Sequence, residues 1–159
     1  MTLYIPAELW VAATDSLLYH PHDRERVAFF DGPRPSDGGP AVATTLVLPE
    51  LVNTWGNYRV SAEAMSRAGK HLRALGMLRF AQLHSHPTEW TGHSEYDDEH
   101  AFTRRTGAIS IVAPHYGACA SGLHDCGVHM CEAGTWRQLD AAEIDRYVRV
   151  IPSKLDFRP

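Results

Sequence analysis

The stretch MLRFAQLHSHP, residues 77–87, constrains this chain most, because a strand pattern ends there at a proline. Leu78 and Phe80 alternate with polar residues, which is typical of a β-strand. Pro87 ends the strand, since it has no N–H to donate to a neighbouring strand. His84 and His86 lie two residues apart at this end. Their side chains therefore share one face of the strand, and both imidazoles can converge on one point.

A zinc site is one interpretation of this pair. Imidazole nitrogen suits zinc at about 2.0–2.1 Å. Asp97, on the first turn of the next predicted helix, can supply an oxygen ligand from across the loop. Two histidines and a carboxylate leave one tetrahedral position open, which is the catalytic pattern of zinc coordination. A water in that position has its pKa lowered to about 7.

Each part of this pattern also has an ordinary structural explanation. A His-x-His pair alone is a weak signal, because such pairs occur in polar loops without a metal. Ser94-x-x-Asp97 fits a capping box, in which Ser94 caps a helix and Asp97 reaches back to the backbone. The metal site and the cap are not exclusive, and the sequence leaves both open.

The remaining elements predict a mixed α/β (α+β) fold with a curved mixed β-sheet and helices packed against it. Ser61 as a cap and Gly76 as a stop mark the clearest helix, and Asp140 is a candidate cap for the last helix. Helices are expected over 6–20, 61–76, 95–107 and 140–151, strands over 26–30, 41–48, 77–84 and 108–114, and a hairpin over 123–139. The Gly- and Pro-rich stretch 31–40 is expected to be a loop or flap.

Length and composition limit the class of protein. The chain has 159 residues, which suits a single domain over 1–159. The net charge of −4 gives no basic excess for nucleic acid, and 44% hydrophobic residues is ordinary. The sequence has no apolar run long enough to span a bilayer and no visible signal peptide, so we expect a cytoplasmic protein without a membrane partner.

Three cysteines, Cys119, Cys126 and Cys131, are too few for a disulfide framework. His124 and His129 lie among them and suggest a second zinc site. However, the positions of Cys126 and Cys131 differ by an odd number, so the two side chains would face opposite sides of one strand. We therefore expect ordinary buried or edge-strand thiols.

The combined motif is more specific than its parts. His84-Ser-His86-Pro87, followed after a short loop by Ser94-x-x-Asp97, resembles the signature of the JAMM metalloproteases, also called JAB1/MPN/Mov34 domains. The order of the predicted elements is similar to the fold of that family over about residues 3–140. The resemblance implies an MPN/JAMM-like fold, a zinc metallopeptidase activity, and zinc held by His84, His86 and Asp97.

The family also has a glutamate far upstream, before an apolar strand that ends in glycine. Glu25 resembles it, because Glu25 precedes VAFFDG. Glu50 is the other candidate and lacks a comparable strand-glycine unit after it. The family often has Cys-Gly in the upstream strand, where this chain has Val27-Ala28. The resemblance implies that Glu25 is the general base, and that Ser94 donates a hydrogen bond to the oxyanion. His93 is expected in a loop or substrate cleft, and Asp98 is expected to point away from the metal.

The resemblance implies a substrate as well. Such enzymes cleave an isopeptide or peptide bond after the C-terminal tail of a ubiquitin-like protein, which can add as a strand beside a sheet edge. Loops 31–40 and 87–93 are expected to line that channel, with Trp90 either in the channel or as a packing anchor. E1-like and E2-like enzymes of a bacterial conjugation system, including antiphage operons, are the expected partners.

Three alternatives remain open at this stage. The first is a peptidase that trims a sulfur-carrier protein in cysteine or cofactor biosynthesis. The second is a non-catalytic MPN interaction scaffold, although such proteins typically lack the ligands. The third is a RadC-like DNA-associated domain, which usually has Asn where this chain has Ser85, and Ser-Gly where it has Thr88-Glu89.

Overall fold

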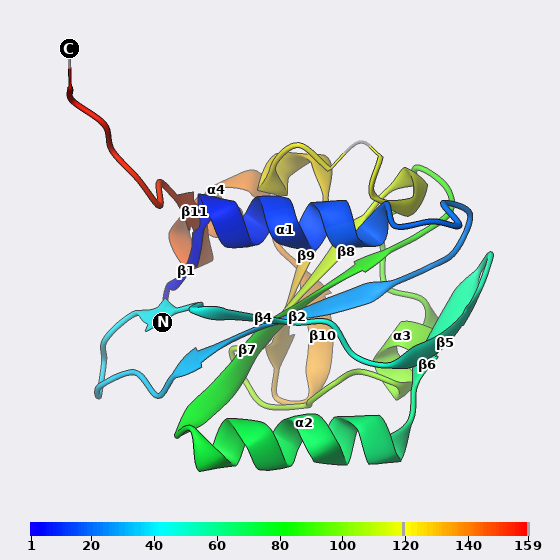
Figure 1. Cartoon of the computed structure of the whole chain (residues 1–159), viewed down its shortest axis with the longest axis horizontal. Helices are drawn as coiled ribbons and strands as arrows, with labels where there is room; N and C mark the ends of the chain where they lie inside the picture. The colour runs from blue at the N-terminus through cyan, green and yellow to red at the C-terminus, as the bar shows by residue number, and fades with distance from the viewer. Residues whose placement is uncertain (119, 159) are drawn as a thin grey trace.

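A mixed β-sheet runs through the middle of the computed structural model, which describes residues 1–118 and 120–158 (Figure 1). Its strand order in the described residues is β10-β9-β8-β7-β2-β4. Only the central pair, β7 and β8, is parallel, and the other neighbours are antiparallel. The strands are β2 (Val27–Pro33), β4 (Thr45–Val47), β7 (Met77–Ser85), β8 (Ile109–Ala113), β9 (Gly127–Glu132) and β10 (Thr135–Gln138).

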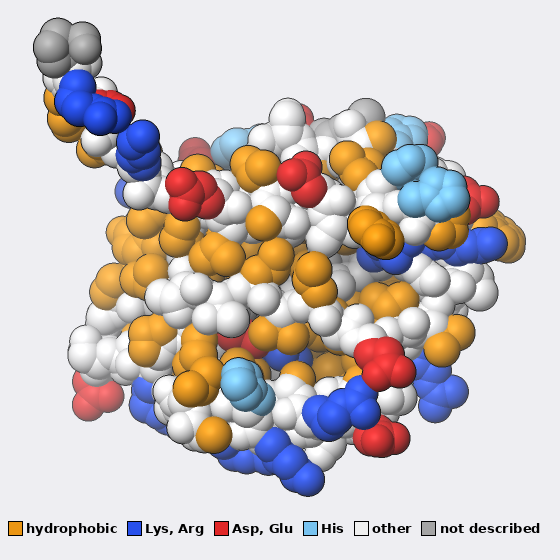
Figure 2. All heavy atoms as spheres, in the orientation of Figure 1, with side chains coloured by type: hydrophobic (Ala, Val, Ile, Leu, Met, Phe, Trp, Pro, Cys, Tyr) orange, Lys and Arg blue, Asp and Glu red, His pale blue; other side chains and the backbone are white. Residues whose placement is uncertain are grey.

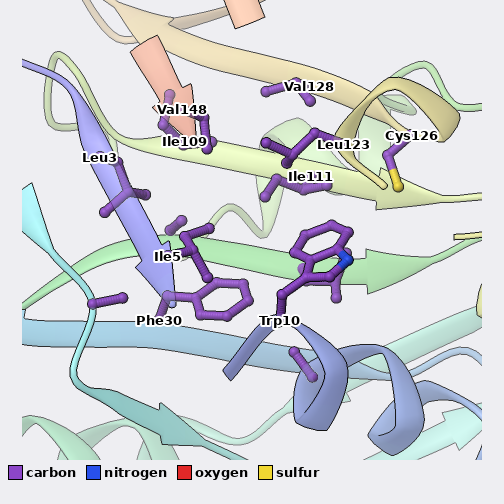
Figure 3. Close-up of a cluster of buried hydrophobic side chains, with 14 of the residues drawn as sticks. Leu3, Ile5, Trp10, Phe30, Ile109, Ile111, Leu123, Cys126, Val128 and Val148 are labelled. Carbon is purple, nitrogen blue, oxygen red and sulfur yellow. The ribbon is translucent and has the colours of Figure 1, made fainter. Parts of the chain in front are cut away.

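One face of this sheet carries the main hydrophobic core. Helix α1 (Ala7–Leu17) lies across it and presents Trp10, Ala13 and Leu17 to the strands. Figure 3 shows the Trp10 indole beside Phe30 of β2, and the two rings stack with centroids 6.5 Å apart. Burying apolar side chains of this size contributes about 1.5–3 kcal/mol each to the free energy of unfolding.

A small parallel sheet closes the same core. Its order is β11-β1-β3, with bounds β1 (Leu3–Pro6), β3 (Ala41–Val42) and β11 (Val148–Ile151). Helix α4 (Ala141–Tyr147) leads directly into β11. Leu3, Ile5 and Val148 from this sheet reach the core in Figure 3.

The opposite side of the sheet carries α2 (Ala62–Ala74), α3 (Glu95–Glu99) and a two-stranded hairpin, β5 (Leu51–Thr54) with β6 (Asn57–Val60) (Figure 1). Helix α2 buries Ala64 and Leu72. Its outer face is basic and solvated, as the row of blue side chains along the lower edge of Figure 2 shows. The short 3₁₀ turns are η1 (His115–Gly117) and η2 (Leu123–Asp125).

The predicted fold class is confirmed, and the helix caps lie where the sequence placed them. The Ser61 hydroxyl accepts from the Ala64 N–H at 3.1 Å, and Gly76 takes the left-handed conformation (φ 66°) that a helix stop requires. Asp140 caps α4, and Ser94 forms the expected capping box with Asp97.

Three predicted elements differ in extent. The helix expected over 140–151 ends at residue 147, because Val148–Ile151 is rich in β-branched residues and pairs with β1. The helix expected over 95–107 ends at residue 99, and Phe102 beyond it packs beside Trp136 instead. The strand expected over 41–48 divides between two sheets, as β3 and β4.

The hairpin β5–β6 and strand β1 were not predicted. The role given to the loop over 31–40 was wrong. Residues 31–33 belong to β2, and Pro33 pairs with Met77, whereas Val27 pairs with His84. Seven residues of strand separate Met77 from His84, which is about 23 Å at 3.3 Å per residue. This loop therefore lies at the opposite end of the sheet from the histidines and cannot line their channel.

None of the described helices has both the length and the apolar character needed to cross a bilayer.

Candidate metal centre

The metal centre lies at the end of the central strand β7. His84 is in the strand, His86 follows it, and Asp97 comes from the first turn of α3. Each of the three offers a ligand atom, and these atoms all lie within 4.8 Å of one another. His84 Nε2 is 3.3 Å from Asp97 Oδ1, and His86 Nε2 is 3.2 Å from Asp97 Oδ2. All three residues are buried.

Backbone contacts fix where these ligands lie. The strand β7 pairs on both sides, with Val27 opposite His84 on one side and Val112 on the other. The His86 N–H donates to the Ala113 carbonyl at 2.9 Å, so the register continues past the last strand residue. The capping box then fixes Asp97, because its side chain must reach back over the N-terminus of α3.

The ring nitrogens of both histidines suit a metal. His86 Nδ1 is 3.1 Å from the Trp90 carbonyl, a contact that holds the proton on Nδ1 and leaves Nε2 for a metal. His84 Nε2 lies 3.3 Å from Asp97 Oδ1 but is not aligned for a hydrogen bond to it. It has no hydrogen-bond partner among the described residues. A buried nitrogen of this kind, facing a carboxylate and a second imidazole, fits a zinc ligand.

Two of the three pKa shifts favour the protonation states that bind a metal, a neutral His84 and an ionised Asp97. Burial lowers the pKa of His84 and outweighs the opposing effect of Asp97. A metal needs this neutral imidazole. Burial would raise the pKa of Asp97, but the close contacts with the His84 and His86 rings outweigh it and lower the pKa, so Asp97 stays ionised. The pKa of His86 is raised, because Asp97 and Glu25 outweigh the effect of burial.

Glu25 lies two residues before β2 and faces the same site. Its backbone N–H donates to the Thr54 carbonyl at 3.0 Å, and its carbonyl accepts from the Asn53 side chain at 3.0 Å. The side chain is 5% exposed. Burial raises the pKa of Glu25 to about 7, with His86 acting against the rise and Asp97 adding to it.

Glu50 lies elsewhere. It is exposed and forms an ion pair with Arg67 of α2. The sequence argument against it was nevertheless wrong, because Glu50 is followed by strand β5 and then by Gly56. Position in the fold separates Glu25 from Glu50, and the strand-glycine pattern does not.

A cleft of about 220 Å³ joins Glu25 to the ligands. Ser94, His86 and Asp97 line it together with Glu25. Its other walls come from the turn of the β5–β6 hairpin and from loop 87–90, lined by Trp55, Gly56, Asn57, Pro87, Thr88, Trp90 and Tyr96. The structure thus brings together Glu25, Ser94 and the three predicted ligands, and it brings one of the two predicted loops to the cleft.

Trp90 combines the two roles considered for it. Its indole stacks on the His86 ring, with centroids 5.1 Å apart and planes 14° from parallel. The ring is still 51% exposed and faces the cleft, where Trp55 stands on the hairpin turn. Gly92 leaves room for this indole, because a Cβ there would come within 2.7 Å of it.

His93 lies in the loop before α3, one of the two places expected for it, and it does not line the cleft. Its side chain is buried behind His84, with ring centroids 5.9 Å apart, and its Nδ1 lies 2.9 Å from Asp98 Oδ1. Asp98 is outside the ligand group, as expected. Sequence reasoning missed Gln82 and Ser110, which lie buried beside these histidines; the polar residues at 82 and 110 within apolar strands were the available signal.

The cysteine-rich segment forms no metal group in the described part of the chain. Cys126 follows η2 and packs in the main core, and Cys131 of β9 packs in a separate cluster with Ala108 and Trp136. Both thiols are buried, as expected, but they do not lie in one strand as the parity prediction assumed. Burial raises the pKa of the Cys126 thiol to about 12. Cys119 lies outside the described residues.

The chain has a distant sequence relative among known proteins. No family model matches the chain. Over 92 residues it is 27% identical to the probable metalloprotease y4jG of Sinorhizobium fredii (strain NBRC 101917 / NGR234), covering 57% of this chain and 56% of that protein. The match therefore spans little more than half of the relative.

Two solved structures are similar over nearly the whole chain. One is the solution structure of protein DSY2949 from Desulfitobacterium hafniense, with a TM-score of 0.68, 11% identity, and coverage of 96% of this chain and 94% of the other. The second is AF2198, a JAB1/MPN domain protein from Archaeoglobus fulgidus, with a TM-score of 0.53, 16% identity, and coverage of 93% and 98%. This chain has the same fold, and its candidate metal ligands lie at the motif.

Proposed function

We propose that this chain, which its fold, motif and metal-ligand geometry assign to the JAMM/MPN family, is a zinc-dependent peptidase. Its substrate would be the peptide or isopeptide bond after the C-terminal tail of a ubiquitin-like protein. The observation that carries the proposal is that buried Glu25 shares one cleft with His86 and Asp97, whose ligand atoms lie within 4.8 Å of that of buried His84. An interaction scaffold needs no such arrangement.

Glu25 is the proposed general base. Zinc held by the two histidines and Asp97 would supply Lewis acidity toward water and the scissile carbonyl. Glu25 then takes the proton of the attacking water and passes it to the leaving amine. A pKa of about 7 suits both steps, because the group gains and loses a proton readily near neutral pH.

Ser94 is the proposed hydrogen-bond donor to the carbonyl oxygen. Its hydroxyl donates to Asp97 Oδ2 at 2.7 Å and accepts from the Asp97 N–H at 3.1 Å. The same carboxylate oxygen also accepts from the Ser94 N–H at 2.8 Å, so it keeps a partner if the hydroxyl turns toward substrate. Such a donor is worth about 3 kcal/mol in the transition state.

The lining of the cleft supports an extended tail with small side chains as the substrate. Two bulky side chains, Trp55 and Trp90, both line it, which favours small residues such as glycine in the bound tail. The hairpin β5–β6 beside it pairs with no further strand among the described residues, so an extended chain could add to its edge. E1-like and E2-like enzymes would supply such conjugates.

The metal assignment is tested by zinc content. His84→Ala and Asp97→Ala should each lose bound zinc, measured by elemental analysis of protein purified with added Zn²⁺. Glu95→Ala is the matched control, because Glu95 is an exposed acid on the same turn of α3. Full zinc content in both ligand variants would contradict the assignment.

The substrate assignment is tested with one ubiquitin-like protein in two forms, a linear fusion to a reporter and a lysine-linked conjugate. Hydrolysis of the lysine-linked form after the terminal glycine supports a deconjugating enzyme. Cleavage of the linear form alone would favour a processing peptidase. If zinc-loaded protein cleaves neither form, the ubiquitin-like substrate is wrong.

A further inference from the structure

A row of buried polar side chains lies behind the metal centre. Gln82 and Ser110 are 2% and 0% exposed, in neighbouring strands β7 and β8, where their backbones pair directly. A sheet interior normally carries apolar side chains at such positions, because a polar group there must find partners to offset its desolvation. These residues do find partners, and the partners lead to His84.

The contacts run in sequence from the surface to the ligand. Asp98, about half exposed, pairs with His93 Nδ1, and His93 Nε2 lies 2.8 Å from Ser110 Oγ. The Gln82 amide nitrogen donates to Ser110 Oγ at 2.9 Å and lies 3.4 Å from His84 Nδ1. Gln82 is thus the last member of the row, next to the ring nitrogen that faces away from the metal centre.

The row is held in place by packing. The His129 ring stacks on His93 with centroids 4.2 Å apart, and His129 Nε2 lies 3.0 Å from the Thr91 carbonyl. Trp136 covers His93 from another side, 5.2 Å away. Ser110 and Gln82 therefore have a fixed anchor and little freedom to move.

We propose that Gln82 is a positioning residue for the metal centre, anchored through Ser110, and that it fixes the ring orientation and tautomer of His84. The inference rests on the proposed function, since it requires a metal at His84 Nε2. A histidine that binds a metal through one nitrogen usually donates the other N–H to a partner, and Gln82 is the partner placed to receive it.

A glutamine suits both states of the site. Without metal, its –NH₂ group can donate to Ser110 and toward His84 Nδ1. With metal on Nε2, His84 carries its proton on Nδ1, and a half-turn of the amide presents Oε1 as the acceptor. The Ser110 hydroxyl can reverse with it, because a hydroxyl both donates and accepts. A carboxylate would serve the metal-bound state only, and an apolar side chain would serve neither.

This difference gives the test, made on the full chain with Zn²⁺ alone and a competing chelator. Gln82→Met should weaken zinc binding about 10–100-fold. Gln82→Glu should bind zinc within about threefold of the unmodified chain, or more tightly, because a carboxylate accepts from His84. Thermal stability of the metal-free proteins should follow the opposite order, with Gln82→Glu lowest, since it buries an acid.

The Co²⁺ absorption spectrum is the second measurement. The ligand-field bands should change in Gln82→Met and stay in Gln82→Glu. A packing role alone would predict the reverse, with Met harmless and Glu damaging in every assay. Equal zinc affinity in Gln82→Met and the unmodified chain would therefore overturn the inference.

Ser110→Ala should also weaken zinc binding, because it removes the anchor of Gln82. Ser85→Ala is its matched control: Ser85 is equally buried and lies between the two histidines, but its hydroxyl accepts from the Arg26 N–H. Equal losses in both variants would contradict the inference. An unmodified chain that fails to bind zinc would overturn the proposed function too, whereas zinc binding indifferent to residue 82 would overturn the inference alone.

Discussion

The surroundings of Glu25 set the pKa of its carboxyl group. A solvent-exposed glutamate is ionised well below neutral pH, and burial in this cleft moves the pKa of Glu25 to about 7. The cause is desolvation, and the neighbouring Asp97 carboxylate acts in the same direction. A residue that gains and loses a proton near the working pH is suited to acid–base catalysis.

Glu25→Gln should therefore keep the zinc and lose about 10²–10⁴-fold in kcat, the usual contribution of a general base. The measurement is zinc content together with steady-state hydrolysis. Glu50→Gln is the control, because Glu50 is exposed and paired with Arg67. If Glu50→Gln causes the loss instead, the base is wrongly assigned.

The pH dependence should follow the ionisation of Glu25. The base is active when deprotonated, so kcat/KM should rise with pH as Glu25 loses its proton. The metal-free pKa is about 7, and a bound cation nearby would lower it, so the midpoint should lie at or below pH 7. This rising limb should be missing from the residual activity of Glu25→Gln, and an unchanged limb would contradict the role.

Ser94 has a structural and a proposed catalytic role, which two variants can separate. Ser94→Ala and Asp140→Ala each remove the cap of a short helix, and each should cost about 1 kcal/mol of stability. Only Ser94→Ala should also lower kcat, by about 10²–10³-fold. Thermal melts and kinetics on the same samples check this, and an equal kcat in both variants would leave Ser94 as a cap only.

At the scale of elements, a hydrogen bond from the η1 turn holds the β5–β6 hairpin beside the cleft. The Tyr116 hydroxyl donates to the Trp55 carbonyl at 2.6 Å. His115 and Tyr116 both adopt left-handed backbone conformations (φ 50° and 56°), which cost about 1–3 kcal/mol each for residues other than glycine. Their N–H groups donate to the Thr88 and His86 carbonyls, so the same turn supports the ligand loop.

Tyr116→Phe should release the hairpin while leaving the ligands in place. We expect faster hydrogen exchange over residues 51–60. KM should rise by up to about tenfold, which corresponds to the net free energy of one hydrogen bond, and the zinc content should not change. Mass-spectrometric exchange and kinetics are the measurements. A lower kcat with an unchanged KM would show that the contact serves the chemistry and not the binding of substrate.

Sequence reasoning succeeded where the signal was local and failed where it depended on distant partners. The caps at Ser61, Ser94 and Asp140 were predictable, because each cap contacts residues three positions away. Strand β11 was not, since its partner β1 lies at the other end of the chain. The hairpin β5–β6 was missed because its strands are only four residues long and half exposed.

The candidate site shows the same difference between residues with a local sequence signal and residues that depend on distant partners. His84 and His86 follow from strand parity, and Asp97 follows from its place on the first turn of the next helix. Gln82 and Ser110 could not be linked to them from sequence, because their contact depends on the register between β7 and β8. The position of Glu25 likewise depends on the pairing of β2 with β7.

For the whole molecule, the main core does not depend on the candidate metal centre. It consists of buried apolar side chains packed around α1, so the chain should stay folded without metal. Zinc at about 100 times its Kd should add about 2.7 kcal/mol, or roughly 5–10 °C in Tm. Thermal melts with Zn²⁺ and with a chelator test this. Complete unfolding on chelation would show that the metal is part of the fold.

The distant position of the loop after β2 has a practical use. Residues 34–40 are mostly exposed, rich in glycine and proline, and lie at the far end of β2 from His84. Exposed loop tips of this kind tolerate insertions best. A purification tag or fluorophore inserted there would leave both the cleft and the flanking hairpin untouched, so the protein could be immobilised with its cleft facing outward.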